Sequence, residues 1–297
     1  MLSLIVTTLS IELPDAPHSS AEWKIAAYSS AAPAPLSAGC GVMEGTTVLR
    51  ASTNGWTCLA ANPRPMPEEG WPSAHVAMPL CTDSEGLKWI QGAMSGAARD
   101  AWGMSRDGFA WMLHGDVGED NTTPFVLDRA DATGPWIESG PHLMLFPADF
   151  HTLAAFPSDP YKGEPFVMFP GTPAAHLMIP VPSYYDYHPE IAAPPVMMPE
   201  YFSHTSDLWK IAAYSSACPS PLSAGATVME GTTVLRAGTN GWTAMAANPR
   251  PMPEGGWPSA HAAMPLCFDA QGLKWMQARA QIRPRNFPAA RFCSAHF

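Results

Sequence analysis

The spacing of apolar positions along the chain predicts two helices in its first third. Residues 22–31 predict a short helix, because serines before it can cap its start and Pro33 ends it. A longer helix is predicted from residue 84 to about residue 102, with Asp83 or Ser84 as its cap. Its apolar residues fall on one helical face: Leu87, Ile90, Met94, Ala97, Ala98 and Ala101.

Short apolar runs between glycines and prolines predict strands. They occupy residues 42–43, 47–50, 109–113, 142–146, 166–169 and 176–179. Asn54-Gly55 follows one such run and precedes Trp56–Leu59, so it predicts a two-residue hairpin turn, since both residues tolerate a positive φ. Strands that collect mainly after helices indicate an α+β fold, with an antiparallel sheet, a few short helices packed on it, and many loops and prolines.

A long segment of the chain occurs twice. Roughly 56 of the 69 positions from Trp23 to Gln91 recur identically from Trp209 to Gln277, which indicates a tandem duplication. Residues 92–181 have no second copy. The predicted organisation is an N-terminal segment (1–17), a complete domain (18–181), a linker rich in Pro and Tyr (182–203), a partial second copy (204–277) and a basic tail (278–297).

The partial copy is short for a domain. If its strands pair with the missing half in a complete domain, it exposes sheet edges and needs a partner, a domain swap or disorder, and self-association through this copy is the candidate partnership. The alternative is that the partial copy results from a truncated or misassembled gene. No other partner is predicted.

Composition indicates a globular chain rich in loops. Proline supplies 33 of 297 residues and charged residues 14%, against averages of about 5% and about 25%. The net charge of −10, with only sixteen Lys and Arg, argues against nucleic-acid binding. No apolar run is long enough to predict a membrane span. Residues 1–17 are apolar enough for a weak signal segment but lack a positive start, so export and a cytoplasmic location both stay open, with export favoured.

Several short motifs occur in an order that resembles a family of uncharacterised bacterial proteins, often predicted to be exported. The motifs lie at residues 48–50, 53–58, 78–81, 140–144 and 171–181. The resemblance spans about residues 22–181 and implies domain boundaries and export, but no activity. The chain departs from the family pattern in its charged loop after residue 113 and in Ala244, which stands where the first copy has Cys58.

Six cysteines include one candidate disulfide. Cys58 ends the predicted hairpin and Cys81 precedes the long helix, and a bond between them would contribute roughly 3 kcal/mol. In a reducing compartment both would be small buried hydrophobic residues. Because Ala244 replaces Cys58 in the second copy, Cys267 is predicted to be a free thiol.

Two His-x-Met triplets form the candidate metal site. On a strand, residues i and i+2 share a face, so His142 and Met144 point the same way, as do His176 and Met178. If the two strands are neighbours, these nitrogen and sulfur ligands suit a copper ion, and zinc is the other candidate. The alternative is that the methionines fill the core and the histidines form hydrogen bonds at strand ends. No cofactor is otherwise predicted.

An acidic loop follows the strand at 109–113. It contains His114, Asp116, Glu119 and Asp120, which could hold a cation or act as an acid and base pair. The spacing does not match an EF-hand, and a solvated loop is the alternative.

The sequence carries no common catalytic motif, such as a nucleophile elbow, a phosphate-binding loop or H-E-x-x-H. We therefore predict a non-enzymatic binding or structural domain. The competing prediction is a metal-handling protein or metal-dependent enzyme that uses the His-x-Met strands.

Overall fold

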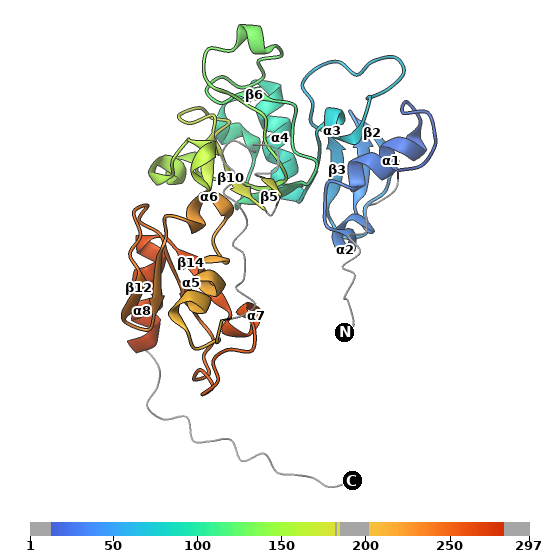
Figure 1. Ribbon diagram of the computed structural model, residues 1–297. Coiled ribbons are helices and arrows are strands. Elements are labelled where there is room, and N and C mark those ends of the chain that lie inside the picture. Colours follow the sequence, from blue (N-terminus) through green and yellow to red (C-terminus); the bar gives the residue numbers. More distant parts are fainter. Residues whose placement is uncertain (1–12, 182, 185–201, 282–297) are drawn as a thin grey trace, which may run out of the picture. The chain divides into compact units, whose positions relative to one another are not determined.

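The computed structural model describes residues 13–181, 183–184 and 202–281. They belong to two units, unit 1 (Met1–Ala192) and unit 2 (Ala193–Phe297), and each is considered by itself (Figure 1). The boundary between the units falls inside the predicted linker. Most of the predicted signal segment, most of that linker and most of the basic tail lie outside the described residues.

Unit 1 combines short helices with short strands. Its α-helices are α1 (Ala21–Ser29), α2 (Ala34–Ser37), α3 (Ala74–Ala77) and α4 (Ser84–Ser95), and its 3-10 helices are η1 (Arg99–Trp102), η2 (Arg129–Asp131), η3 (Phe150–Ala155) and η4 (Pro160–Lys162). Its strands are β1 (Gly41–Glu44), β2 (Thr47–Arg50), β3 (Thr57–Ala60), β4 (Pro79–Thr82), β5 (Gly108–Met112), β6 (Glu119–Asp120), β7 (Trp136–Ile137), β8 (His142–Phe146), β9 (Phe166–Met168) and β10 (His176–Pro180).

Eight of these strands form one sheet, in the order β2-β1-β3-β4-β5-β8-β10-β9. All neighbours are antiparallel except β1 and β3, which run parallel. The remaining strands, β6 and β7, form a small separate ribbon. The α+β fold with a mostly antiparallel sheet is therefore confirmed.

Helices cover both faces of the large sheet. Because side chains alternate along a strand, Cys58 and Cys81 join the core beneath α1, whereas Leu59 and Leu80 face the core beneath α4. Ser20 caps α1 by accepting a hydrogen bond from the Trp23 amide, at 3.2 Å. On the same face of the sheet as α1, strands β8, β9 and β10 pack against η3 and form a smaller apolar cluster.

The predicted hairpin at Asn54-Gly55 is wrong. Strand β3 pairs with β1 and not with β2, so this turn carries the chain across β1. Gly55 has φ +79°, but Asn54 is not in the left-handed region that a type I′ turn requires. The Asn54 amide instead donates to the Leu36 carbonyl of α2 at 2.8 Å, so the turn is held by contact with a helix earlier in the chain. The actual hairpin joins β1 and β2 at Gly45, with φ +55°.

The longer helix ends earlier than predicted. Helix α4 stops at Ser95, and Gly96 adopts φ +68° as a left-handed cap. The chain then turns back through η1, which brings the ring of Trp102 against Gly92. A Cβ at Gly92 would lie 2.3 Å from that ring, so the close packing requires glycine.

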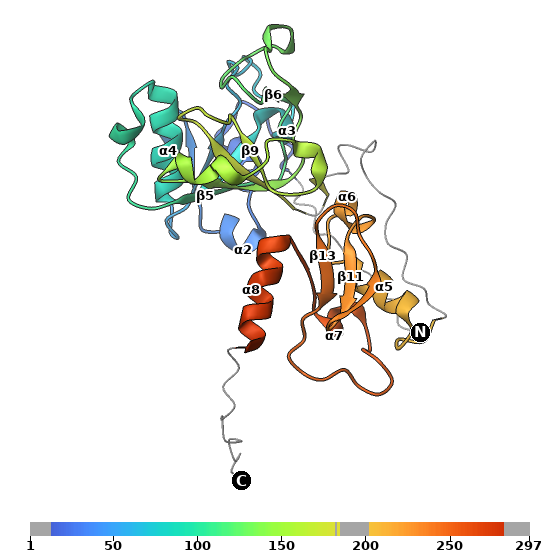
Figure 2. The same cartoon turned by 90° about the vertical axis from the view of Figure 1, so that its left-hand side faces the viewer.

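Unit 2 repeats the first half of this architecture. Its helices are α5 (Asp207–Ser215), α6 (Ser220–Ser223), α7 (Ala260–Ala263) and α8 (Ala270–Gln281), and its strands are β11 (Thr227–Glu230), β12 (Thr233–Arg236), β13 (Thr243–Ala246) and β14 (Pro265–Phe268). The sheet order is β12-β11-β13-β14, and α5 packs on β11, β13 and β14 (Figure 2).

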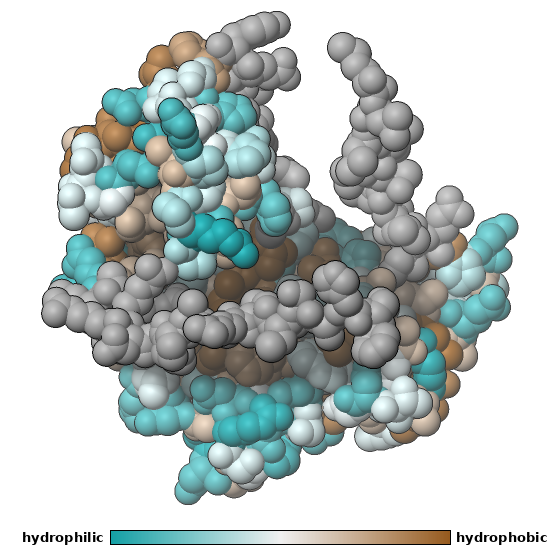
Figure 3. Space-filling view, turned by 90° about the horizontal axis from the view of Figure 1, so that it is seen from below, coloured by the Kyte–Doolittle hydropathy of each residue, from teal (hydrophilic) through white to brown (hydrophobic). Residues whose placement is uncertain are grey.

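Apolar side chains that are buried in unit 1 are exposed in unit 2. Leu80 is 5% exposed, but its counterpart Leu266 is 44% exposed; Trp89 is 6% exposed, but its counterpart Trp275 is 61% exposed. The reason is that β14 has no described counterpart of β5 beside it. On the face drawn in the space-filling view, brown apolar residues lie among teal hydrophilic ones (Figure 3).

Candidate functional site

A cavity of about 830 Å³ lies in unit 1. Helix α4 and strands β3, β4, β5, β8, β9 and β10 supply most of its wall. The apolar part of the wall includes Met78, Met112, Met144, Met168, Met178, Trp89, Phe146 and Phe169. Sites for small organic molecules have volumes of roughly 300–1,000 Å³ and mostly apolar walls. This cavity is therefore the candidate functional site.

Two glycines set the distance between α4 and the sheet. A Cβ at Gly108 of β5 would lie 2.3 Å from the Gly86 amide nitrogen of α4, so helix and strand are in direct backbone contact. Asp83 caps α4 by accepting from the Gly86 amide at 2.8 Å. Trp89, on the same helix, then stacks on Phe146 of β8, with 4.2 Å between ring centroids.

The two His-x-Met triplets lie on neighbouring antiparallel strands and line the cavity. Met144 faces Met178 directly, while His142 is opposite Pro180. His142 and His176 therefore flank the methionine pair from opposite ends, four residues apart or roughly 13 Å along the strands.

In the described part of the chain, no three His, Asp or Glu ligand atoms in the cavity wall come within 4.8 Å of one another. The cavity therefore lacks a cluster of three such ligands, although both thioethers lie between the imidazoles. A copper or zinc ion at His142, Met144, His176 and Met178 stays a prediction.

Both imidazoles are held in one orientation. Nδ1 of His142 donates to the Gly140 carbonyl at 2.6 Å, and Nδ1 of His176 donates to the Ala174 carbonyl at 3.0 Å. These bonds assign the proton to Nδ1 and leave Nε2 as an acceptor. Burial, which disfavours the imidazolium, lowers the pKa of each ring to about 4. Both histidines are therefore neutral near pH 7.

Two polar atoms in the wall have no partner among the described residues. Nε2 of His142 and Nε1 of Trp89 are buried without a hydrogen bond. Buried polar atoms are nearly always paired, and an unpaired one costs roughly 1–3 kcal/mol. A bound molecule that donates to His142 and accepts from Trp89 would satisfy both atoms.

The structure divides the predicted acidic loop between two roles. Asp116 and Glu119 line the cavity. Burial raises the pKa of Asp116 to about 6, although its Oδ1 accepts from the Gly118 and Ser139 amides at 2.9 and 2.8 Å. Burial and the charge of Asp116 raise the pKa of Glu119 to about 8. Perturbed carboxyl groups in a cleft are typical of functional sites.

The other two members of the loop face elsewhere. Nε2 of His114 bonds to the Ser30 hydroxyl at 2.7 Å, on the α1 side of the molecule. Asp120 accepts from the Thr122, Thr133 and Gly134 amides at 2.6–3.0 Å, which holds the loop between β6 and β7. These bonds lower the pKa of Asp120 despite burial. Asp120 therefore organises the loop, and we assign it no direct contact with a ligand.

Three exposed residues form the rim of the cavity. Phe125, Leu127 and Met94 line it and are also 46%, 47% and 72% exposed. They come from the loop after β6 and from the end of α4. Phe125 has φ +65°, which is costly for a bulky residue and is often found where a loop serves function.

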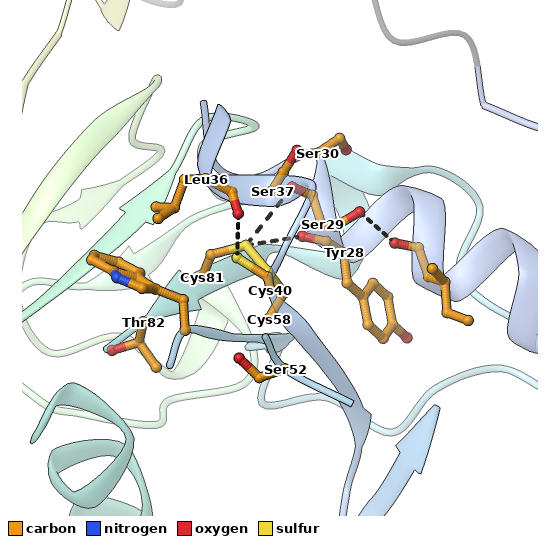
Figure 4. Close-up of a disulfide and its surroundings, with 12 residues drawn as sticks. Tyr28, Ser29, Ser30, Leu36, Ser37, Cys40, Ser52, Cys58, Cys81 and Thr82 are labelled. Atoms are coloured by element: carbon orange, nitrogen blue, oxygen red, sulfur yellow. Dashed lines mark hydrogen bonds between the residues drawn. A yellow bond between two sulfur atoms is a disulfide. The ribbon is translucent and has the colours of Figure 1, made fainter. Parts of the chain in front are cut away.

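The structure contains the predicted disulfide. Cys58 and Cys81 are opposite each other on β3 and β4, and their sulfurs are bonded. The buried thiol of Cys40 lies beside this bond and donates to the Leu36 carbonyl (Figure 4). The three sulfurs lie within 4.8 Å of one another. Burial raises the pKa of the Cys40 thiol, which makes it a poor nucleophile.

The prediction of a free thiol at Cys267 is wrong. Cys267 forms a disulfide with Cys218, which occupies the position of Ala32 in the first copy. The cysteine at this position of the repeat thus has a different partner in each unit. Cys81 bonds to the neighbouring strand through Cys58, whereas Cys267 bonds to Cys218 just after the first helix of unit 2. Sequence comparison alone could not reveal this second partner, because the two cysteines are 49 residues apart.

Sequence reasoning missed the cavity itself. Its wall combines α4 with strands from both halves of unit 1, and the signal for it was indirect: seventeen methionines, with two of them next to histidines on strands. The rim residue Phe125 carried no signal in the sequence.

Comparison of the chain with models of protein families, with curated proteins and with solved structures finds no match. The resemblance to a bacterial family stays a prediction, and function is inferred from the geometry of the cavity. None of the described helices combines the length and the apolar character that a membrane crossing needs.

Proposed function

We propose that unit 1 is an exported, non-enzymatic binding domain that holds an apolar small molecule in its cavity. The observation that carries this proposal is the buried, unpartnered Nε2 of His142 in the wall of an apolar cavity of about 830 Å³. A closed apolar core would leave no such volume, since protein interiors are normally close-packed. The two disulfides support export, because such bonds persist mainly in oxidising compartments.

The cavity wall is apolar and can adapt to the shape of a ligand. Methionine side chains are flexible and polarisable, so they adjust to ligands of different shape. Trp89 and Phe146 add a stacked aromatic wall. The neutral histidines contribute hydrogen bonds without charge. These features favour binding over nucleophilic chemistry.

The duplication supplies a matched test of this proposal. Leu59 lines the cavity, whereas its counterpart Met245 lies on β13 of unit 2, which lacks the rest of the wall. We expect Leu59→Trp to weaken binding of the neutral probe N-phenyl-1-naphthylamine at least tenfold, because the larger side chain occupies ligand volume. Met245→Trp should leave binding within twofold of the unmodified chain. Both affinities are measured by fluorescence titration of the full chain.

The outcome that contradicts the proposal is equal loss or equal retention of binding in the two variants. Equal retention would place the probe outside the cavity, and circular dichroism of each variant separates loss of the site from loss of the fold.

We also propose that unit 2 associates with unit 2 of a second copy through β14. Its exposed Leu266, Met264 and Trp275 support this proposal, since exposed apolar side chains beside an unpaired strand edge favour strand pairing. A second copy supplies the same edge under twofold symmetry.

A further inference from the structure

The polar side chains at one end of the cavity are mostly hydrogen-bond acceptors. Asp116 and Glu119 contribute carboxyl groups, and His142 contributes the bare Nε2 of a neutral ring. The methionine sulfurs of the wall are acceptors as well. A ligand that satisfies this end must donate hydrogen bonds.

Backbone contacts bring these acceptors to the same end. The Asp116 amide donates to the Ser139 carbonyl at 2.9 Å, and the Ser139 amide donates to the Asp116 carboxylate at 2.8 Å. Ser139 lies three residues before His142. His142 pairs with Met112 across the sheet, and Met112 lies four residues before Asp116. The loop after β5 therefore places Asp116 near the start of β8, where His142 lies, and Glu119, whose charge Asp116 affects, pairs with Ile137 just before Ser139.

Arg64 acts on the charge of Glu119, but its hydrogen bonds go to other groups. The guanidinium of Arg64 donates from Nε to the Leu127 carbonyl at 2.7 Å and lies over the Trp136 ring at 5.8 Å. In the described part of the chain, the Glu119 side chain forms neither an ion pair nor a hydrogen bond, although Arg64 and Asp116 both act on its charge. His75 acts on the charge of Asp116.

We infer that the ligand is an apolar amine whose ammonium group binds between Asp116 and Glu119 and whose hydrocarbon part lies against the methionine and aromatic wall. This inference rests on the proposed function of the cavity. An ammonium group offers three donors and no acceptor, which complements a pair of carboxyl groups. The unpartnered Nε2 of His142 is an acceptor for a further donor of the ligand in the same cavity. Hydrogen bonds between an ammonium group and a carboxylate are stronger than those between neutral groups.

Binding should release a proton. Glu119 has a pKa of about 8, because burial and the charge of Asp116 favour its neutral form. An ammonium ion favours the carboxylate, so the protonated acid and the ammonium ligand form a carboxylate–ammonium pair and one proton passes to the buffer. The O–H bond of the protonated Glu119 breaks, its proton passes to the buffer, and the resulting carboxylate pairs with the ammonium group. No electron transfer is involved.

The test uses three probes that differ only in their head group: octylamine, octanol and octanoate. Calorimetric titration of the full chain at pH 7 should show octylamine binding at least tenfold more tightly than octanol, with octanoate weakest. Titrations in two buffers with different ionisation enthalpies should show proton release with octylamine and none with octanol. Glu119→Gln should weaken octylamine at least tenfold and leave octanol within twofold.

A charge-matched control is Glu68→Gln, which changes an exposed glutamate outside the cavity wall and should alter neither affinity. Equal affinity for octylamine and octanol, or preference for octanoate, would overturn the amine inference and leave the binding proposal standing. Failure of all three probes to bind would overturn both. Octanol affinity also reports whether Glu119→Gln retains a folded cavity.

Discussion

At the scale of single residues, the cavity depends on polar groups kept uncharged by burial. His142 is fully buried, and His176 is 5% exposed. Each ring uses Nδ1 to bond a carbonyl two residues earlier in the chain, so the strand itself orients the ring. Because both rings are neutral, they can lie in an apolar wall, where an unpaired imidazolium would be strongly unfavourable.

This arrangement predicts a loss of stability in acid. The pKa of His142 falls from 6.5 to about 4 on folding, so below pH 6.5 the unfolded chain binds a proton that the folded chain does not. Its contribution to the unfolding free energy is therefore complete above pH 6.5 and is lost as the pH falls toward 4, by roughly 3 kcal/mol. His142→Gln should remove this part of the pH dependence. Calorimetric melting temperatures at pH 7 and pH 4.5 provide the measurement.

For His142→Gln, the quantity compared is the change in melting temperature between pH 7 and pH 4.5, not the melting temperature itself, because the substitution also changes packing. If the melting temperatures of the variant and the original chain fell equally between the two pH values, His142 would not be neutral and buried in the folded state. His176→Gln serves as the parallel variant at the other end of the methionine pair.

At the scale of elements, the contact between α4 and β5 distinguishes the two copies. In unit 1 a Cβ at Gly86 would meet the Thr82 hydroxyl at 2.0 Å and the Phe146 ring at 3.0 Å. In unit 2 the atoms nearest to a Cβ at the equivalent Gly272 belong to Phe268 and Asp269, at 3.1 Å or more. The same helix thus packs tightly against a sheet in one copy and is largely open in the other.

Alanine at these two glycines should therefore have opposite consequences. Gly86→Ala is expected to destabilise unit 1 by about 1–3 kcal/mol, because it overpacks a closed contact. Gly272→Ala should be neutral or stabilise α8 by up to about 1 kcal/mol, because alanine has the higher helix propensity. Hydrogen exchange measured by mass spectrometry on peptides specific to each unit follows the two effects within one chain. Equal destabilisation of both units would contradict the open packing of α8.

At the scale of the whole molecule, several differences between the copies correspond to the absent half of unit 2. In unit 1 the Thr82 hydroxyl donates to the Phe109 carbonyl at 2.9 Å, and Glu85 accepts from the Ser105 amide at 2.7 Å. Both partners belong to the segment without a second copy, and unit 2 has Phe268 and Gln271 at these positions. The polar groups that would lose their partners have been replaced.

The local cap is retained. Asp269 accepts from the Gly272 amide at 2.7 Å, as Asp83 does from Gly86, because this bond lies within one helix turn. Together with the second disulfide, these features describe a half-domain with its own core.

The uncovered edge of that half-domain predicts concentration-dependent association. We expect the full chain to dimerise in sedimentation measurements and Leu266→Lys to reduce dimer formation at least tenfold, because a charge on an edge strand disfavours pairing. Val234→Lys changes an exposed apolar residue on β12, at the other edge of the sheet, and is the matched control. A monomer at all concentrations, or equal loss in both variants, would contradict association through β14.

Much of the architecture follows from the sequence alone. The repeat, the capped start of each main helix, most of the longer strands and the Cys58–Cys81 pair were predicted, because these features depend on local periodicity, capping and spacing. Strand β4 was not predicted, because its sequence follows a proline-rich loop without alternation. The two His-x-Met triplets were also placed correctly on one face of their strands, since alternation along a strand is a local property.

The tertiary structure decided the rest, because it depends on which distant segments meet. The parallel pairing of β1 with β3 turned a hairpin signal at Asn54-Gly55 into a crossover, and close contact with Trp102 set the path of the chain after α4. The antiparallel register of β8 and β10 placed His142 and His176 at opposite ends of the methionine pair. The cavity and the raised pKa of Glu119 arise only when these segments come together and bury the carboxyl group. The partner of Cys267 likewise depends on which distant segment packs beside its strand in unit 2.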